Sequence, residues 1–392
     1  MTSSGDERYL TTAEVARRLG VKAETVYTYV SRGLLTSVRA KGRRGSLFPL
    51  GEVDRLAQRG SEGQQPSGSV ERIRTRLTRI DDDELAYRGH RVRDLVGTNG
   101  FEAVASLLWT GELAGRPFPA PPDQVALAAA VGEALPETAS LTDRLRVAVA
   151  ALGSADPLRF DVSADAVVAA GEPLLGVLVD ALPGLAPGRT ASGTLAERLW
   201  PKVSALPPRP ELLDAVLVLL ADHGLAVSTV AARVAASARA NLYAVVSAGL
   251  GAVDGPYHGA ASTLAYRFLA EAMRDPIGAL SEHLRAGGVP GYGHRVYRRR
   301  DPRAEILFGL LDGAPVLDTV EIVSRELAKR GGAFPNVDLA LAALMHANGM
   351  APETGEAIFA IARTAGWIAH ALEEYAEPRL RFRPMGVYIG PG

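Results

Sequence analysis

From about residue 72 onward, apolar side chains recur at steps of three and four residues, the spacing of one face of an α-helix. Glycines follow several of these segments, as they do at helix ends, and alternating strand-like patterns are scarce. The pattern predicts a large all-α domain. Several segments are apolar nearly all round, so we expect them in a core or a subunit interface; examples are ELLDAVLVLLADHG (211–224), VDLALAALMHANG (337–349) and AIFAIARTAGWIAHALEEYA (357–376).

A second, smaller unit is predicted at the N-terminus. The segment TTAEVARRLG (11–20) has Thr11 three residues before Glu14, which is the spacing of a helix capping box. After a tight turn, KAETVYTYVSRGLL (22–35) repeats the helical pattern. The following segment, TSVRAKGRRGSLFPL (36–50), contains two short strand-like runs around a basic tip. Together these segments predict a helix–turn–helix followed by a wing.

Residues 9–59 resemble the winged helix–turn–helix of MerR-type and excisionase-type DNA-binding domains. In such modules the second helix enters the major groove and the wing contacts phosphates. The resemblance implies DNA contacts by Lys22, Thr25, Tyr27 and Thr28 in the second helix, and by Arg39, Lys41, Arg43 and Arg44 in the wing. DNA is therefore a candidate partner of residues 1–59. The alternative interpretation is a small helical domain that contacts another protein.

Charge is distributed unevenly along the 392 residues. The net charge of the whole chain is −1, whereas residues 1–59 contain eleven Lys and Arg against six Asp and Glu. A basic segment beside an acidic remainder favours contact with a polyanion, although such an excess also arises by chance in small domains. The segment GSEGQQPSGS (60–69) lacks large apolar residues, so we expect residues 60–71 to form a flexible linker.

Three features that the sequence lacks are cysteine, a signal-peptide pattern and a long apolar run, and each absence excludes a class of site or protein. The chain has no cysteine, which excludes disulfides, cysteine zinc ligands and thiol nucleophiles, and which fits a reducing cytoplasm. The N-terminal residues lack the pattern of a signal peptide, and no apolar run approaches the length of a membrane span. We therefore expect a cytoplasmic protein without membrane contact.

The segment GYGHRVYRRRDPRA (291–304) places a histidine between a glycine and a run of arginines. Alone, it fits either a surface turn before a solvated helix or an anion-binding loop with an acid–base residue. Three further motifs, each weak alone, accompany it in order along the chain: DHGLAVST (222–229), GPYHGAAS (255–262) and FPNVDLALAAL (334–344). Small residues beside a histidine let the backbone and a ligand approach closely.

Together the four motifs resemble the citrate synthase family, and the resemblance extends from about residue 72 to the C-terminus. It implies an all-α homodimer whose chains each have a large domain, residues 72–258 and 349–392, and a small domain, residues 259–348. It also implies a reaction in which acetyl-CoA or propionyl-CoA condenses with oxaloacetate to give citrate or 2-methylcitrate and CoA. We expect no cofactor beyond these substrates and no metal.

The resemblance also implies a role for each motif residue. Asp338 corresponds to the base that removes a proton from the acyl-CoA, His258 to the donor at the thioester oxygen, and His294 to the acid at the oxaloacetate carbonyl. Arginine suits a dianionic substrate because its planar guanidinium pairs with both oxygens of a carboxylate. The implied oxaloacetate contacts are His223, Arg303, Phe359, Arg363 and, from the neighbouring subunit, Arg383; the implied CoA contacts are Val289, Gly291, Gly293 and Arg298.

The chain departs from the family pattern at several points. The stretch 158–210 is shorter than usual and matches poorly, Gly224 stands where glutamate is common, and Met385 stands where many bacterial members have arginine. None of these changes removes a residue of the catalytic set. The N-terminal unit and the altered stretch also fit a second hypothesis, a one-component DNA-binding regulator that uses a citrate synthase-like domain as a metabolite sensor.

Overall fold

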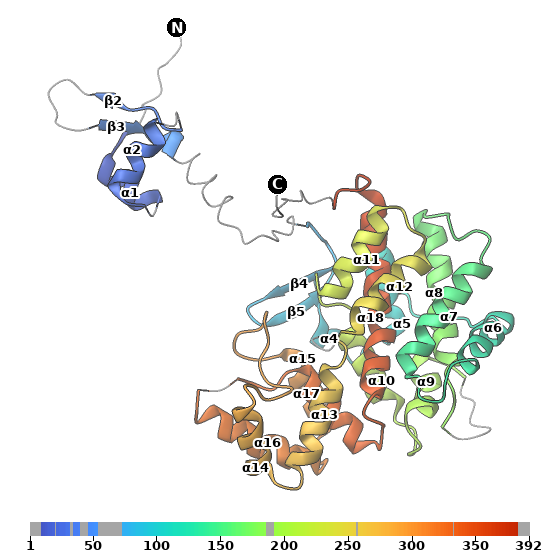
Figure 1. The fold of residues 1–392 in the computed structure, drawn as a ribbon. Helices are drawn as coiled ribbons and strands as arrows, with labels where there is room; N and C mark the ends of the chain where they lie inside the picture. Colours follow the sequence, from blue (N-terminus) through green and yellow to red (C-terminus); the bar gives the residue numbers. More distant parts are fainter. Residues whose placement is uncertain are drawn as a thin grey trace. The chain divides into compact units, whose positions relative to one another are not determined.

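The computed structural model describes residues 9–19, 21–31, 34–39, 46–53, 73–185, 192–255, 258–331 and 333–382. The chain divides into two compact units, Met1–Ile73 and Arg74–Gly392, drawn as ribbons in Figure 1. The predicted linker and four predicted site residues, Lys41, Arg43, Arg44 and Arg383, lie outside the described residues, and only the backbone of Arg39 is described.

The described residues of the N-terminal unit form two short helices, a further helical segment over 50–53 and an antiparallel sheet. The backbone N–H of Thr11 donates to Glu14 Oε2 at 2.8 Å and that of Glu14 donates to Thr11 Oγ1 at 3.4 Å, so the predicted capping box is present. A small core of Val15, Val26, Leu35, Phe48 and Val53 is buried between the elements. The elements are β1 (Tyr9–Thr11), α1 (Thr12–Leu19), α2 (Ala23–Ser31), β2 (Val38–Arg39) and β3 (Ser46–Pro49), with the strand order β1-β3-β2.

The larger unit begins with a three-stranded antiparallel sheet. Its strands are β4 (Thr78–Asp81), β5 (Glu84–Tyr87) and β6 (His90–Arg91), in chain order. A two-residue turn at Asp82 and Asp83, both with positive φ, joins β4 to β5. The hydrophobic pattern did not predict this sheet, because β5 is buried on both faces and lacks alternation.

Helices form the rest of the larger unit, as the pattern predicted. They are α4 (Val92–Leu95), α5 (Phe101–Thr110), α6 (Pro122–Glu133), α7 (Leu141–Ala155), α8 (Ala164–Asp180), α9 (Leu195–Val203), α10 (Pro210–Leu220), α11 (Val227–Ser237), α12 (Leu242–Val253), α13 (Ala261–Ala272), α14 (Pro276–Arg285), α15 (Pro302–Leu310), α16 (Val316–Ala328), α17 (Val337–Ala347) and α18 (Thr354–Ala376).

The long helix α18 runs through the middle of this unit (Figure 1). It contacts α5, α7, α8, α10, α11 and α12, and it is buried on nearly every side, as its largely apolar pattern predicted. Two glycines permit this packing. A Cβ atom on Gly366 would lie 2.5 Å from the Ala221 carbonyl oxygen, and one on Gly249 would lie 2.5 Å from the Trp367 ring. The end of α10 is therefore held directly against α18.

The stretch that matched the family poorly contains two ordered helices, α8 and α9. Thr194 and Glu197 form a capping box at the start of α9. Arg198 of α9 is buried, and its guanidinium donates to Asp180 Oδ1 at 2.8 Å and to the carbonyl oxygen of Phe118 at 2.6 Å. The shortened segment therefore keeps a packed connection to the core.

The helices α13 to α17 pack largely on one another. The helix α17 contacts α13, α15 and α16, and both α13 and α17 contact α18. These helices lie in the predicted small domain, residues 259–348, whose boundaries stay a prediction.

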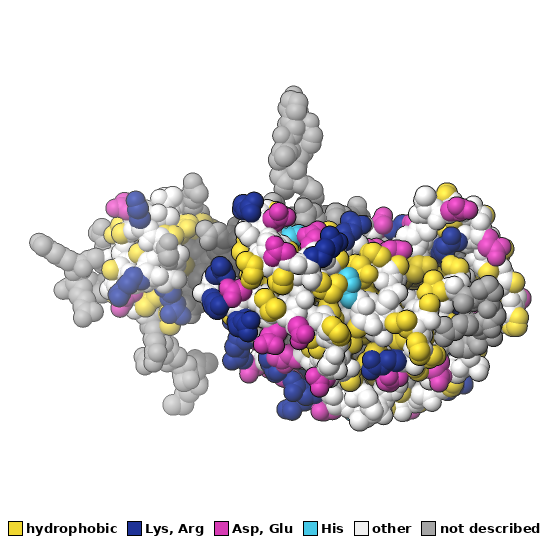
Figure 2. Space-filling view, turned by 90° about the horizontal axis from the view of Figure 1, so that it is seen from below, with side chains coloured by type: hydrophobic (Ala, Val, Ile, Leu, Met, Phe, Trp, Pro, Cys, Tyr) yellow, Lys and Arg dark blue, Asp and Glu magenta, His cyan; other side chains and the backbone are white. Residues whose placement is uncertain are grey.

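The surface bears charges of both signs. On the face shown in Figure 2, Lys and Arg side chains are interspersed with Asp and Glu, and histidine side chains are visible among hydrophobic ones. Of the helices that the structure describes, none is long and apolar enough to cross a membrane.

Candidate active site

The four sequence motifs supply side chains to one region of the larger unit. His223 follows α10, His258 precedes α13, and His294 lies in the loop between α14 and α15. The other predicted substrate contacts and the predicted base lie in helices. Arg303 lies in the first turn of α15 and Asp338 in the first turn of α17. Phe359 and Arg363 lie in α18.

The loop that bears His294 is tied to the start of α17. The backbone N–H of Gly293 donates to the Phe334 carbonyl oxygen at 2.7 Å, and that of Asn336 donates to the Gly291 carbonyl oxygen at 2.9 Å. Gly291 has φ +80°, and a Cβ atom there would lie 2.7 Å from Leu339 Cβ. Only glycine fits so close to α17 in this backbone conformation.

Asp338 has the properties of a base that works near neutral pH. Its N–H donates at 2.9 Å to Oδ1 of Asn336, the residue that caps α17. Burial raises the pKa of the Asp338 carboxyl group to about 6. The positive charge of Arg303 lowers this pKa, and the negative charge of Asp301 raises it. A carboxylate with such a pKa is ionised at pH 7 and still basic enough to accept a proton.

The hydrogen bonds of His294 determine which ring nitrogen donates. Its Nδ1 accepts the backbone N–H of Val296 at 3.0 Å and that of Tyr297 at 3.2 Å. Burial, followed by the charge of Arg303, lowers the pKa of His294 to about 4, so the ring is neutral at pH 7. Because Nδ1 accepts two backbone N–H groups at shorter distances than the 3.5 Å that separates Nε2 from Arg303 Nη2, we place the single proton of the neutral ring on Nε2.

His223 lies edge-on to His294, with the ring centroids 5.2 Å apart. Its Nε2 and the hydroxyl of the buried Tyr297 are 3.0 Å apart and share a hydrogen bond. Burial, with smaller effects from the charges of Arg303 and Arg363, lowers the pKa of His223 well below its usual value. Like His294, it is therefore neutral at pH 7.

His258 is held by a residue that the motifs contain but did not assign. Its Nε2 lies 2.8 Å from the hydroxyl oxygen of Ser228, in the first turn of α11. Its ring meets that of Phe359 edge-on, with centroids 5.5 Å apart. Burial, with the charge of Arg363, lowers the pKa of His258 to about 4. A hydroxyl that donates to Nε2 leaves the proton on Nδ1.

Arg303 is buried in an ion pair that also organises the helix starts. Its Nε and Nη2 donate to the two carboxylate oxygens of Asp301 at 3.0 and 2.8 Å. Asp301 also accepts the backbone N–H of Val337 at 2.9 Å, which joins the start of α15 to the start of α17. The Arg303 guanidinium lies 3.5 Å from His294 Nε2, so both groups border the same space.

Arg363 is a buried guanidinium that has no carboxylate partner among the described residues. Its Nε donates to the Leu220 carbonyl oxygen at 2.8 Å, and its Cζ lies 4.6 Å from the centroid of the Phe359 ring. Within the described part of the chain, it forms no ion pair. A buried charge in this state is costly, and an anionic ligand removes that cost.

Some of the predicted contact residues lie outside the group of histidines, arginines and Asp338 described above. Arg298 is exposed, and its backbone N–H donates to Asp83 Oδ1 at 2.7 Å; its predicted role with CoA stays a prediction, as does that of the partly buried Val289. In the N-terminal unit, the side chains of Lys22, Tyr27 and Thr28 are exposed and that of Thr25 is partly buried. Their predicted DNA contacts likewise stay predictions.

The motifs also contain supporting residues whose roles the sequence did not indicate. Ser228, Asp301 and Asn336 lie within the quoted motifs and hold His258, Arg303 and Asp338 respectively. Their position in the first turn or at the cap of a helix was the available signal, because Ser, Asp and Asn favour those positions. Which functional side chain each one supports depends on the tertiary structure.

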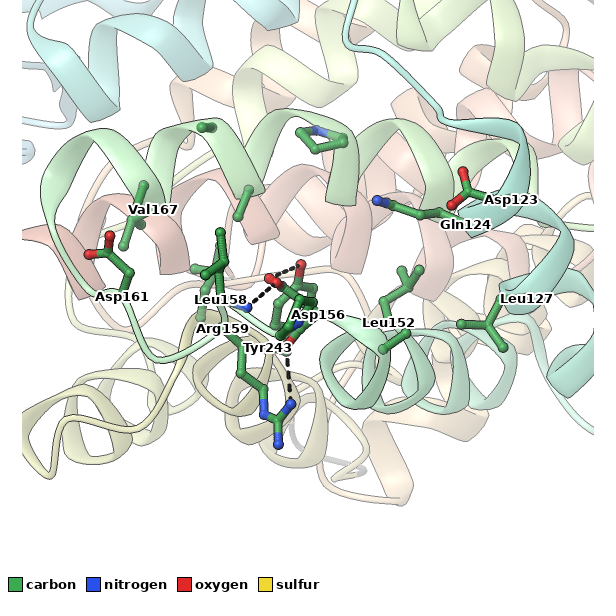
Figure 3. A pocket seen from close by; sticks show the side chains of 17 residues that line it. Asp123, Gln124, Leu127, Leu152, Asp156, Leu158, Arg159, Asp161, Val167 and Tyr243 are labelled. Atoms are coloured by element: carbon green, nitrogen blue, oxygen red, sulfur yellow. Dashed lines mark hydrogen bonds between the residues drawn. The ribbon is translucent and has the colours of Figure 1, made fainter.

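A separate cavity of about 530 Å³ lies between α6, α7, α8 and α12 (Figure 3). Asp156 is at its centre: its Oδ2 accepts the hydroxyl of Tyr243 at 3.0 Å, and its backbone carbonyl accepts Arg159 Nη1 at 3.0 Å. None of the predicted site residues lines this cavity. It is therefore distinct from the group formed by His223, His258 and His294 with their arginine neighbours, which we call the histidine cluster.

Comparison with known proteins agrees with this architecture. A family model described as the citrate synthase C-terminal domain matches residues 68–385, and a helix-turn-helix domain model matches residues 9–61. The chain is 30% identical over 344 residues to the 2-methylcitrate synthase of Mycobacterium tuberculosis, covering 79% of this chain and 85% of that protein. It is 31% identical over 346 residues to the citrate synthase of Acidithiobacillus ferridurans, covering 78% and 89%.

Solved structures share the fold of the larger unit. The citrate synthase of Thermoplasma acidophilum, in a ternary complex with carboxymethyl coenzyme A and oxaloacetate, gives a TM-score of 0.68 at 24% identity, covering 85% of this chain and 96% of that one. The citrate synthase of Thermotoga maritima also gives 0.68 at 24% identity, covering 84% and 96%. The family model and these relatives extend over most of the sequence, so the chain belongs to the citrate synthase family, with a helix-turn-helix domain at its N-terminus.

Proposed function

We propose that this protein is an acyltransferase that condenses acetyl-CoA or propionyl-CoA with oxaloacetate and releases CoA. The observation that supports this most is the environment of Asp338: a carboxyl group with a pKa of about 6, close to the buried Arg303 and Arg363. Two histidines with pKa values of about 4, His258 and His294, border the same arginines. A base, two neutral donors and two cations are the groups that this reaction requires.

In the first step, Asp338 removes a proton from the carbon next to the thioester carbonyl. Negative charge then develops on the thioester oxygen, and His258 Nδ1–H donates to that oxygen. Ser228 supports this assignment because its hydroxyl engages His258 Nε2. The donor acts where charge appears in the transition state, and so lowers the barrier rather than only binding the substrate.

In the second step, the enol carbon attacks the ketone carbon of oxaloacetate. The carbon–oxygen double bond opens, and His294 gives its Nε2 proton to the resulting alkoxide. Arg303 and Arg363 bind the two substrate carboxylates, and Arg363 gains the anionic partner that it otherwise lacks. Water then adds to the thioester carbonyl of the condensed product and gives a proton to the His294 imidazolate. The carbon–sulfur bond breaks, and the CoA thiolate takes the proton that Asp338 removed in the first step. No cofactor takes part in these steps.

We further infer a homodimer in which Arg383 of each chain reaches the neighbouring site. The dianionic substrate supports this role, because a third cation strengthens carboxylate binding. Arg383→Ala is expected to raise KM for oxaloacetate, and a mixture of Arg383→Ala and Asp338→Asn chains is expected to regain turnover in mixed dimers. A mixture whose turnover at low oxaloacetate does not exceed the sum for the two variants measured separately would contradict the shared site.

The direct test of the activity is release of CoA thiol by the purified chain with acetyl-CoA and with propionyl-CoA, each with and without oxaloacetate. Oxaloacetate-dependent release from either donor supports the proposal, and the larger kcat/KM identifies the donor. One methylene changes pocket preference by about 1–3 kcal/mol, so this choice needs measurement. Absence of release with both donors would contradict an enzymatic role.

A second candidate function is regulation of transcription by the same chain. The matched helix-turn-helix domain and the exposed Tyr27, at 53% relative exposure on α2, support it. In this case the synthase-like unit binds oxaloacetate or acyl-CoA, and ligand binding changes the affinity of the N-terminal unit for DNA. A dimer would present two such units and favour a palindromic site.

Selection from a pool of random DNA duplexes tests this candidate. Enrichment of a sequence, with affinity that falls as salt rises, supports DNA binding. Thr28→Ala is expected to weaken the selected complex, and Thr110→Ala is a matched control, because both hydroxyls donate to the carbonyl four residues earlier on an exposed helix face. Equal binding by both variants, or no enrichment at all, would count against this function.

A further inference from the structure

A buried polar network lies next to the histidine cluster, centred on Arg233 of α11. Arg233 is fully buried, and it uses its guanidinium to join three side chains of α18. Its Nη1 lies 2.7 Å from His370 Nδ1 and 2.9 Å from Glu373 Oε2, and its Nη2 lies 3.0 Å from Glu374 Oε2. None of these four residues belongs to the sequence-predicted site.

His370 connects this network to Asp222. Arg233 is a donor only, so His370 Nδ1 must accept, and the proton of the neutral ring is then on Nε2. His370 Nε2 lies 3.3 Å from Asp222 Oδ1, and both groups are fully buried. Neither atom forms a hydrogen bond with any other group that the structure describes. Each of the two atoms is therefore the other's available partner.

Asp222 fixes the turn that presents His223. Its Oδ2 accepts the hydroxyl of Thr78 and, at 3.0 Å, the backbone N–H of Gly224. The second hydrogen bond forms a turn over residues 222–224, and His223 is the middle residue of that turn. The hydroxyl of the buried Tyr87 donates to the Asp222 carbonyl oxygen at 2.9 Å. Both the side chain and the backbone of Asp222 are thus held in place.

The network also joins both ends of the larger unit. At the C-terminal side, Arg381 donates from Nε and Nη2 to the two carboxylate oxygens of Glu374 at 2.6 and 2.7 Å. At the N-terminal side, the backbone N–H of Arg76 donates to Glu373 Oε1 at 2.8 Å. Three carboxylates and the buried or partly buried guanidinium groups around them are therefore connected across segments far apart in the sequence.

We propose that His370 and Arg233 are positioning residues for oxaloacetate: through Asp222 they fix the turn that holds His223 in the substrate site. Buried ion networks are poor sources of stability, because removing charges from water offsets most of the gain from pairing them. What such a network does supply is a single arrangement of the segments that it joins. Here the joined segments include the residue directly before His223.

This inference rests on the proposed function, and direct binding of oxaloacetate separates the two. Titration calorimetry of the full chain with oxaloacetate is expected to show binding. His370→Phe is expected to raise Kd and KM for oxaloacetate at least tenfold, with kcat within about threefold, because an aromatic ring is kept while the polar contacts with Arg233 and Asp222 are lost. His370→Gln, which keeps a donor near the Nε2 position, is expected to recover part of the affinity.

A matched pair of buried arginines controls for loss of stability. Arg233→Lys and Arg198→Lys each remove a buried guanidinium from a carboxylate partner, and both are expected to lower Tm. Only Arg233→Lys is expected to weaken oxaloacetate binding. A fall in affinity for Arg198→Lys as large as that for Arg233→Lys would mean that general destabilisation explains both, and would overturn the inference.

A variant on the opposite side of Asp222 keeps the test decisive if His370→Phe does not fold. Thr78→Val removes the hydroxyl that donates to Asp222 Oδ2 and leaves α18 intact. It is expected to raise the oxaloacetate Kd at least threefold. Unchanged affinity in a folded His370→Phe or Thr78→Val chain overturns the inference, whereas absence of binding by the unmodified chain contradicts the proposed function itself.

Discussion

The side-chain amide of Asn336 donates from Nδ2 to the Gly293 carbonyl oxygen at 2.8 Å, across the gap between α17 and the loop that bears His294. The other end of the same amide, Oδ1, accepts the backbone N–H of Asp338 at 2.9 Å. One side chain therefore sets the position of the proposed base relative to the proposed acid. In a reaction that depends on geometry, this link matters more for the rate than for stability.

Replacement of Asn336 by alanine is expected to lower kcat by about 10²-fold, since small misplacements of reacting groups cost this much. Loss of the helix cap is expected to cost about 1 kcal/mol of stability. Asn241→Ala is the matched control, because Asn241 caps α12 by accepting the Ala244 N–H at 3.0 Å. Steady-state kinetics and urea unfolding should show similar stability losses and a kcat defect only at Asn336; equal kcat values would contradict the linking role.

Gly291→Ala is expected to disturb the loop, whereas Gly287→Ala is not. Both glycines have positive φ, +80° and +101°, so each alanine carries a backbone penalty of about 1–2 kcal/mol. Only at Gly291 would the new Cβ meet another atom, Leu339 Cβ at 2.7 Å. We expect KM for acyl-CoA to rise at least tenfold for Gly291→Ala and to stay unchanged for Gly287→Ala. Similar KM values for the two variants would argue against the loop as a CoA contact.

The pKa of Asp338 predicts the acid limb of the pH–rate profile. The carboxyl group must be ionised to accept a proton, so kcat/KM for acyl-CoA at saturating oxaloacetate should fall tenfold per pH unit below about 6. Bound oxaloacetate adds negative charge and moves this midpoint upward rather than downward. The histidine pKa values near 4 lie below this window. A profile that is flat between pH 5 and pH 8 would contradict Asp338 as the base.

Asp338→Asn is expected to stabilise the fold, and more so at high pH. The pKa is about 6 in the folded chain against an ordinary value of 3.8 for the carboxyl group of aspartate, so the folded state holds the proton more tightly. Stability of the unmodified chain therefore falls as pH rises from about 4 to about 6 and stays lower above it. We expect a gain of roughly 1–3 kcal/mol for the variant at pH 8 and roughly a third of that gain at pH 4.5. Urea unfolding at both pH values measures it; a gain independent of pH would exclude this origin.

The sequence predicted the large helical unit, because helical periodicity is local information, whereas the chemistry of the motif residues stays a prediction that the family resemblance implies. The helix α18 is apolar on most sides, so most of its burial follows from its composition, whereas the burial of its polar residues does not. The proposed roles of His258, His294 and Asp338 come from the resemblance of the motifs to the citrate synthase family. The pKa values that make these residues suited to their roles depend on burial by other segments, which no local pattern contains.

The features that the sequence did not reveal depend on contacts between distant segments. The sheet β4–β6 was missed because β5 is buried on both faces. The network around Arg233 was missed because Thr78, Asp222 and His370 are separated by more than a hundred residues, and a buried histidine in an apolar helix looks like a packing residue. Ser228 lies in the motif DHGLAVST, whereas its partner His258 lies in the motif GPYHGAAS, so neither motif alone shows the contact.

Oxaloacetate-dependent release of CoA by the unmodified chain and by Asp338→Asn, measured side by side with oxaloacetate binding, tests the central claim most directly. Removal of the base is expected to lower turnover by 10²–10⁴-fold, because the amide accepts no proton. Oxaloacetate should still bind, since Arg303 and Arg363 remain. Turnover in Asp338→Asn equal to that of the unmodified chain would contradict the account.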